Sequence, residues 1–218
     1  MFLSLEEPLS QGSPKLKSPK PAAGNKKTKT VPTPKKIKLE LPPSTFDAPE
    51  ETTIKMYNGH EFNEDKDGFV HVYTDGSCIG SLQNRKAGFG VFYGVDNKYN
   101  LSEPVGGRAT NNVGEIRASI EAIKNAQCCG IKRLNIFTDS QFLIKSVVLW
   151  MEGWKANDWK SDRNKAVLNK VEFVELDNLI RKCNLQIKWS YIAAHKGLPG
   201  NTESDKLAKD GAEKYCQV

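Results

Sequence analysis

The stretch that decides the fold is Phe69-Val70-His71-Val72-Tyr73-Thr74-Asp75-Gly76-Ser77. Residues Phe69–Thr74 are rich in aromatic and β-branched side chains, which predicts a β-strand that ends at Asp75. The stretch Phe137-Thr138-Asp139-Ser140 ends a second predicted strand in the same way. Two strands therefore carry an aspartate at the same offset from their carboxyl ends.

The chain around these two stretches predicts a sheet flanked by helices. Three early strands form an antiparallel meander, whose second and third strands are joined by a hairpin turn at Gly94–Lys98. Later strands alternate with helices, which indicates parallel additions to the same sheet. We expect strands at Phe69–Thr74, Gly88–Tyr93, Tyr99–Val105, Leu134–Thr138 and Gln186–Tyr191, and helices at Asn112–Gln127, Ser140–Met151, Val167–Lys182 and Asn201–Tyr215. The predicted class is α/β with a five-stranded mixed sheet.

The matching aspartates suggest a site at one edge of this sheet. If their strands are neighbours, Asp75 and Asp139 lie across one inter-strand spacing, roughly 5 Å. Two carboxylates at that distance repel each other unless one is protonated or a divalent cation lies between them. Oxygen ligands favour Mg²⁺ or Mn²⁺ over Zn²⁺. Each aspartate also has a structural explanation as a turn or capping residue, and Glu115 and Asp205 stand at capping-box spacing. That explanation leaves the two matching strand ends unaccounted for.

The N-terminal third of the chain has a different composition. Nine of the eleven prolines fall between residues 8 and 49, and Lys15–Lys38 holds nine lysines and no acid. Residues 40–67 hold eight acids and two lysines. We therefore expect residues 1–67 to be mostly disordered and residues 68–218 to form the globular domain. The block Pro34–Lys38 is open to three interpretations: a nuclear address, a nucleic-acid-binding arm or a solvated linker.

Composition excludes several classes of protein. The 218 residues carry a formal charge of +6 and contain no run of 18 apolar residues, so we expect no membrane partner. Met1–Leu5 runs directly into acids, unlike a secretory signal, and the first arginine is Arg85, unlike an Arg-rich mitochondrial presequence. Five cysteines without a Cys-x-x-Cys pair argue against a disulfide scaffold and fit a reducing compartment. We expect a nuclear or nucleocytoplasmic protein, and nothing in the sequence demands more than a monomer.

Motifs in a fixed order resemble those of the ribonuclease H family. Tyr73–Ser77 followed by Gly88–Val91 resembles the opening of the family. The other matching stretches are Thr110–Glu115, Phe137–Ser140, His195–Gly197 and Gly200–Asp205. The stretch Trp150–Lys155 with Trp159-Lys160 resembles the basic protrusion of the eukaryotic type 1 enzymes. The resemblance covers about residues 68–216.

This resemblance implies the ribonuclease H fold and hydrolysis of the RNA strand of an RNA–DNA hybrid, leaving 5′-phosphate and 3′-hydroxyl ends. Carried over by motif, the metal-binding carboxylates are Asp75, Glu115, Asp139 and Asp205, which would hold two Mg²⁺ ions, with Mn²⁺ as a substitute. His195 in the family assists proton transfer or product departure.

The resemblance also implies how the hybrid is held. Arg108, Thr110 and Asn169 match a phosphate pocket for the DNA strand. Asn111 and Asn112 suit recognition of the RNA 2′-hydroxyl, although the family usually has glutamine where Asn112 stands. The remaining expected contacts to the DNA strand are Trp150, Trp154, Lys155 and Lys160.

Two other functions compete with a hybrid nuclease. A hybrid-binding protein that has lost cleavage is disfavoured because all four acids are present. An integrase or transposase that acts on DNA with the same fold is disfavoured by the basic protrusion and by Thr110–Asn112. Many eukaryotic relatives add an N-terminal hybrid-binding module; residues 1–67 lack its aromatic and glycine content, so we expect it to be absent.

Overall fold

The computed structural model describes residues 51–194 and 196–216. They belong to one compact unit, Leu39–Val218. The lysine-rich block, the segment Pro34–Lys38 and His195 lie outside the described residues. Within the described part of the chain, no helix is both long and apolar enough to cross a bilayer.

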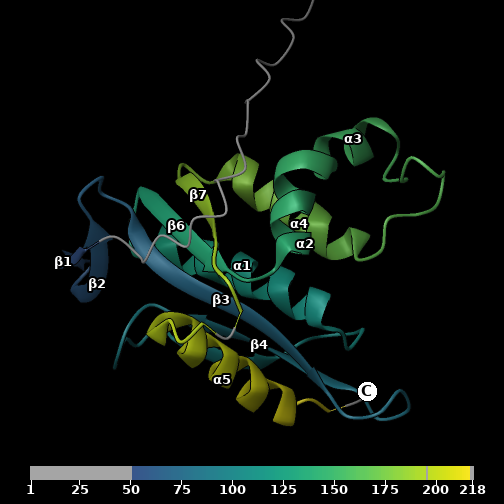
Figure 1. The fold of residues 1–218 in the computed structure, drawn as a ribbon. Helices are drawn as coiled ribbons and strands as arrows, with labels where there is room; N and C mark the ends of the chain where they lie inside the picture. The colour runs from purple at the N-terminus through teal and green to yellow at the C-terminus, as the bar shows by residue number, and fades with distance from the viewer. Residues whose placement is uncertain (1–50, 195, 217–218) are drawn as a thin grey trace, which may run out of the picture. The chain divides into compact units, whose positions relative to one another are not determined.

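The centre of the fold is a mixed sheet (Figure 1). Strands β3, β4 and β5 form an antiparallel meander, β6 pairs with β3 in parallel, and β7 pairs with β6 in parallel. Their bounds are Val70–Ile79 for β3, Lys86–Phe92 for β4, Leu101–Pro104 for β5, Arg133–Thr138 for β6 and Gln186–Tyr191 for β7. The prediction of a five-stranded mixed sheet is confirmed for these strands, and two further strands extend it to seven.

The two additional strands correct the predicted domain boundary. Strands β1 (Thr52–Tyr57) and β2 (His60–Asp65) form an antiparallel hairpin, so the expectation of a disordered tail is wrong for residues 52–65. Asn58 and Gly59 turn the chain with positive φ angles, which is the preferred chemistry of a two-residue hairpin loop. The acidic composition of this segment concealed that turn signal. The hairpin is held because buried Phe62 packs against the rings of Tyr93 and Tyr99.

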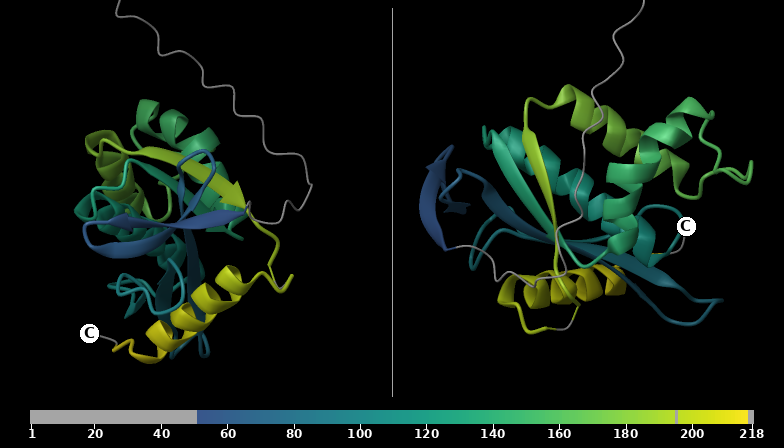
Figure 2. Two further views of the ribbon diagram at one scale, coloured as in Figure 1. Left: turned by 90° about the vertical axis from the view of Figure 1, so that its left-hand side faces the viewer. Right: turned by 45° about the horizontal axis from the view of Figure 1, so that its top comes forward.

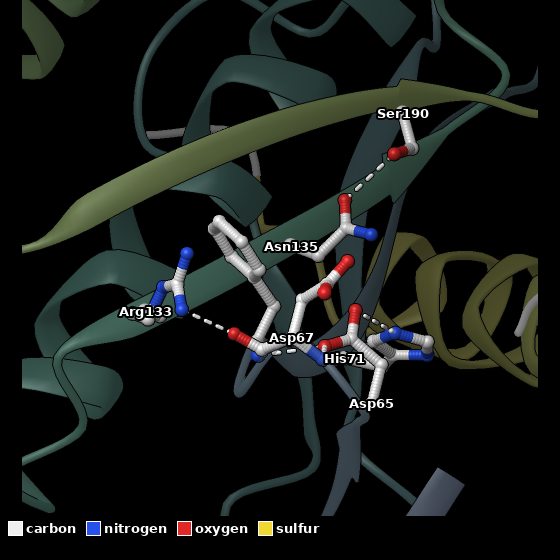
Figure 3. A network of polar contacts seen from close by, with 7 residues as sticks. Asp65, Asp67, His71, Arg133, Asn135 and Ser190 are labelled. Carbon is white, nitrogen blue, oxygen red and sulfur yellow. Dashed lines mark hydrogen bonds and ion pairs between the residues drawn. The ribbon is translucent and has the colours of Figure 1, made fainter. Parts of the chain in front are cut away.

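Asp65, the last residue of β2, links the hairpin to the central strand β3 by a polar contact with His71 (Figure 3). Its carboxylate accepts hydrogen bonds from the backbone N–H groups of Asp67 and Phe69 at 3.0 and 2.8 Å, and the His71 Nε2 lies 3.1 Å from its other oxygen. Burial raises the pKa of Asp65, but these hydrogen bonds and the imidazole outweigh burial and lower it. The buried carboxylate is therefore stabilised in its ionised form.

The helices cover the two faces of the sheet (Figures 1 and 2). Helix α5 (Pro199–Glu213) packs on β3, β4 and β5, whereas α1 (Asn111–Cys128) packs on the other face of β3 and β4. Helix α4 (Lys170–Lys182) packs against α1. Glycines permit these close approaches: a Cβ on Gly76 would lie 2.3 Å from the Glu115 nitrogen of α1, and one on Gly90 would lie 2.1 Å from the Ser204 oxygen of α5. Strands β3 and β4 are therefore packed closely between α1 on one face and α5 on the other.

The helix expected at Ser140–Met151 is longer and less regular than predicted. It comprises α2 (Gln141–Lys145), a π-helical segment (Ser146–Trp150) and α3 (Met151–Ala156). The wider π-helical turn changes the direction in which the following side chains project. The capping of α1 also differs from the capping box expected between Asn112 and Glu115, three residues apart. Thr110 is the N-cap residue, and its hydroxyl accepts a hydrogen bond from the Val113 N–H.

Candidate metal centre

Three carboxylates from three different elements meet at one edge of the sheet. Asp75 lies within β3, Glu115 in the first turns of α1, and Asp139 directly after β6. One ligand oxygen from each lies within 4.8 Å of the others. Asp75 and Glu115 are buried and Asp139 is half-buried. Among the described residues, these three form a group of metal-ligating side chains.

The parallel pairing of β3 with β6 explains why the two aspartates meet. Tyr73 is the register partner of Phe137, so Asp75 and Asp139 each stand two residues beyond the same rung. The rings of Tyr73 and Phe137 stack with centroids 5.0 Å apart and support that rung. The equal offsets in the sequence therefore become neighbouring carboxylates in the structure.

The assembly of these acids is electrostatically unfavourable. Burial, followed by the charges of Asp139 and Asp205, raises the pKa of Asp75 to about 7. Burial, followed by the charges of Asp75 and Asp139, raises the pKa of Glu115 well above its usual range. The Thr138 hydroxyl donates to Glu115 at 3.2 Å and the Gly76 backbone also hydrogen-bonds it, but both only partly offset the rise. The charge of Lys209 lowers the pKa of Asp75 without cancelling this rise.

Asp205, the fourth predicted carboxylate, lies at the rim of this group. It is half-buried on α5 and lies 2.6 Å from the ammonium of Lys209, one turn along the same helix. It does not belong to the three oxygens within 4.8 Å, but its charge contributes to the raised pKa of Asp75. The structure therefore brings three of the predicted ligands together and places the fourth beside them.

Asn201 is a site residue that sequence reasoning missed. Its side chain, on the first turn of α5, is 7% exposed and donates from Nδ2 to Asp139 Oδ2 at 3.3 Å. Its Oδ1 is buried with no hydrogen-bond partner among the described residues. An asparagine near a helix start has many structural uses, so only the tertiary structure, which brings the first turn of α5 to the residue that follows β6, reveals this contact.

The donor set fits a divalent cation. The three carboxylates offer hard oxygen ligands, and a cation between them would remove the repulsion that raises the pKa values of Asp75 and Glu115. The buried Asn201 Oδ1 without a partner is consistent with a further donor, such as water, at this site. Oxygen-only ligands favour Mg²⁺ or Mn²⁺ over metals that select sulfur or nitrogen.

The residues predicted to bind substrate lie before and at the start of α1, before α4 and on the protrusion. Thr110 caps α1, and the exposed Asn111 and Asn112 begin it. Arg108 is exposed in the preceding loop, and Asn169 precedes α4 in a left-handed conformation with φ of +60°. No described contact joins Arg108, Thr110 and Asn169 to one another.

The protrusion carries two neighbouring tryptophans. The rings of Trp150 and Trp154 lie 5.9 Å apart, and Trp150 is 39% exposed, whereas Trp154 packs on Phe173 of α4. Lys160 is exposed, but the Lys155 ammonium lies against Glu152 and Asp177, at 2.6 and 3.0 Å. From the sequence, both lysines were expected to contact the DNA strand. In the structure, Lys160 is exposed, whereas Lys155 is paired with two acids.

Comparisons with known proteins agree with this fold. Residues 67–213 match the family model of RNase H. The chain is 40% identical over 146 residues to human Ribonuclease H1, an alignment that covers 66% of this chain and 50% of that protein. It is 36% identical over 149 residues to Ribonuclease H of Cupriavidus necator, covering 66% of this chain and 95% of that protein. The chain thus spans about half the length of its mammalian relatives.

A solved structure provides a further comparison. The foamy viral protease–reverse transcriptase, determined in complex with an RNA/DNA hybrid, aligns with a TM-score of 0.56 at 25% identity. The alignment covers 66% of this chain and 20% of the viral chain. The similarity is therefore to one part of the larger viral protein.

Proposed function

Because the chain belongs to the ribonuclease H family, we propose that it is an endonuclease that hydrolyses the RNA strand of RNA–DNA hybrids. The observation that carries the proposal is the meeting of Asp75, Glu115 and Asp139 within 4.8 Å. A structural explanation of each acid as a cap or turn residue does not account for three mutually repelling carboxylates in one place. The viral relative determined with an RNA/DNA hybrid supports the substrate class.

The proposed mechanism uses two Mg²⁺ ions, with Mn²⁺ as a substitute, held by Asp75, Glu115, Asp139 and Asp205. When bound, such ions supply an attacking water of lowered pKa and stabilise the leaving 3′ oxygen, which gives 5′-phosphate and 3′-hydroxyl ends. Asp75 and Glu115 would be ionised in that state, since the cations offset the repulsion that otherwise favours their protonation.

Neighbouring side chains orient these acids. The Thr138 hydroxyl holds Glu115, and the Asn201 amide holds Asp139. His195 is proposed to transfer a proton or assist product departure. Residues that hydrogen-bond a metal-binding carboxylate determine its direction and basicity, so Thr138 and Asn201 belong to the working site.

The substrate is proposed to lie across the start of α1 and the protrusion. Asn111 and Asn112 are exposed beside Glu115, where short amides suit the 2′-hydroxyl of the RNA strand. The proposed contacts to the DNA strand are Arg108, Thr110, Asn169, Trp150, Trp154 and Lys160. These contacts read the backbone and sugars, so we expect little base specificity.

A duplex cleavage assay tests the proposal. The protein is incubated with end-labelled RNA–DNA, RNA–RNA and DNA–DNA duplexes, with Mg²⁺ or with a chelator. We expect cleavage of the RNA strand of the hybrid only, and only with the metal. Tight hybrid binding without cleavage would indicate a binding protein, and cleavage of DNA–DNA would indicate an integrase-like enzyme.

The lysine-rich N-terminal region is proposed to add affinity for the hybrid. The nine lysines of Lys15–Lys38 would contact phosphates in a salt-sensitive manner. Deletion of residues 1–50, which keeps the β1–β2 hairpin, should raise KM at low salt and leave kcat unchanged. An unchanged KM would contradict this role. Fusion of residues 1–50 to a fluorescent protein would test the proposed nuclear address at Pro34–Lys38.

A further inference from the structure

A buried acid on α4 has no part in the proposed chemistry. Asp177 is 4% exposed and lies on α4, the helix that packs against α1. The four candidate metal ligands lie on other elements. The Lys155 ammonium lies 3.0 Å from its Oδ1, and the Arg181 guanidinium contacts its Oδ2. A buried carboxylate is costly unless it is paired, so this position is specified by its two cationic partners.

Lys155 is the partner that comes from the protrusion. Its side chain is 20% exposed and is held between Asp177 and Glu152 of its own helix. Two acids at 2.6 and 3.0 Å neutralise its charge. The nearby cations that face solvent are Lys160, Arg163 and Lys165. The solvent-exposed positive charge of the protrusion is therefore carried by the segment 160–165, which follows α3.

A second contact joins the same two helices. The ring of Trp154, adjacent to Lys155, packs on Phe173 with centroids 5.3 Å apart. Phe173 precedes Asp177 by four residues, so both contacts fall on one side of α4. Helix α3 thus attaches to α4 through one aromatic contact and one ionic contact.

Helix α3 is the last part of the helical run from Gln141 to Ala156, and irregular backbone lies on both sides of it. It has six residues and follows a π-helical segment. Immediately after it, Asp158 and Trp159 have positive φ angles, which non-glycine residues rarely adopt. The regular α-helical hydrogen bonding is thus interrupted before α3 and the chain turns directly after it, so contacts with α4 contribute to fixing the direction of α3.

We propose that Asp177 is a positioning residue for hybrid binding. It acts through Lys155 to hold α3, and with it the tryptophan pair Trp150 and Trp154, in the orientation that meets the DNA strand. Lys155 accordingly links α3 to α4 through its ion pair with Asp177 and does not contact a phosphate. This inference rests on the proposed function.

The direction in which one substitution changes hybrid affinity distinguishes the two possible roles of Lys155, which are to link α3 to α4 or to contact a phosphate. Asp177→Asn removes a negative charge, which by simple electrostatics strengthens binding to a polyanion. If Asp177 positions α3, the same change weakens hybrid binding, because a neutral amide holds the Lys155 ammonium less strongly than a carboxylate does and the tryptophans are then less firmly oriented. Asparagine has nearly the same shape as aspartate and still accepts a hydrogen bond from Lys155, so the fold is expected to survive.

The experiment measures hybrid binding by fluorescence anisotropy in chelator, across a series of salt concentrations. We expect Asp177→Asn and Lys155→Met each to raise Kd about fivefold, equivalent to roughly 1 kcal/mol, with little further loss in the double variant. The slope of log Kd against log salt should stay unchanged for Lys155→Met. Glu121→Gln is the matched control: it removes an acid paired with Lys124 on α1 and should leave Kd unchanged.

Three results would overturn the proposal. Tighter binding by Asp177→Asn, or a salt slope reduced by about one in Lys155→Met, would make Lys155 a phosphate contact. A lower Tm with an unchanged Kd would limit Asp177 to stability. Acrylamide quenching of tryptophan fluorescence provides a substrate-free readout, and it should increase in Asp177→Asn. A wild-type protein that does not bind hybrid would contradict the proposed function, while quenching would still decide the attachment of α3.

Discussion

Asn201 Nδ2 donates a hydrogen bond to Asp139 Oδ2 at 3.3 Å and so joins the first turn of α5 to the end of β6. The two residues are separated by 62 positions in the chain. The contact links the covering helix to the carboxylate group, so the direction of Asp139 depends on the position of α5. This relationship makes α5 part of the site through a residue other than its acid.

Replacement of Asn201 should damage activity more than stability. We expect Asn201→Ala to lower kcat and Mg²⁺ affinity by about 10- to 100-fold, which is typical when the hydrogen-bond partner of a metal ligand is removed. Steady-state kinetics over a Mg²⁺ series and a thermal unfolding curve would measure both effects. Thr202→Ala, on the exposed side of the same turn, is the control. A large loss of Tm with normal kinetics would show that Asn201 only packs.

Asp75→Asn should abolish cleavage and stabilise the metal-free protein. The pKa of Asp75 is raised from its ordinary value of 3.8 to about 7 in the folded protein. Ionisation of Asp75 therefore destabilises the fold as the pH rises above 3.8, and the full cost is reached once the pH exceeds the folded pKa. Asparagine removes that cost, and at pH 8 in chelator we expect a gain of about 2–4 kcal/mol. Wild-type protein should gain stability on addition of Mg²⁺, and the variant less.

Circular dichroism melts with chelator and with Mg²⁺ measure this effect. Asp210→Asn makes the same charge change at an exposed position of α5 and should alter neither Tm nor activity. Destabilisation by Asp75→Asn in chelator would mean that repulsion among the acids is not the dominant force at this site.

Asp65 should contribute stability that depends on pH. Its pKa is lowered from the ordinary 3.8 because hydrogen bonds and His71 outweigh burial. An acid with a depressed folded pKa stabilises the fold above its unfolded pKa, and this stabilisation is lost as the pH falls through the folded value. Asp65→Asn should therefore cost about 1–3 kcal/mol at pH 7 and progressively less below pH 4. Urea unfolding at pH 7 and pH 3 compares the two, and an equal cost at both would exclude ionisation as the cause.

The glycines facing α5 should be intolerant of any side chain. In Gly90→Ala the added Cβ would lie 2.1 Å from the Ser204 backbone oxygen, so α5 must move away from the sheet. We expect a loss of about 1–3 kcal/mol and a reduced kcat, because α5 carries Asn201 and Asp205. Gly106→Ala, whose Cβ would meet no atom within 4 Å, should change neither. Unchanged activity in folded Gly90→Ala would separate the site from the position of α5.

The proximity of Asp75 and Asp139 was predictable on the condition that their two strands are neighbours. A strand alternates with a period of two, and parallel neighbours align their carboxyl ends, so equal offsets at Asp75 and Asp139 imply proximity. Glu115 was predictable from its motif. The hairpin at residues 52–65 was not, because its Asn58-Gly59 turn lay in an acidic segment and its partner rings, Tyr93 and Tyr99, come from another part of the chain.

The sequence by itself determined the five central strands, the helices that flank them and the acids that share one edge of the sheet, since these follow from periodicity and from short motifs. Only the tertiary structure decided that Asn201 holds Asp139 and that Lys155 is bound by Asp177. A side chain's charge or amide is encoded in the sequence, but its partner is whichever group the packing of distant helices brings within about 3 Å, and that distance is set by the whole fold.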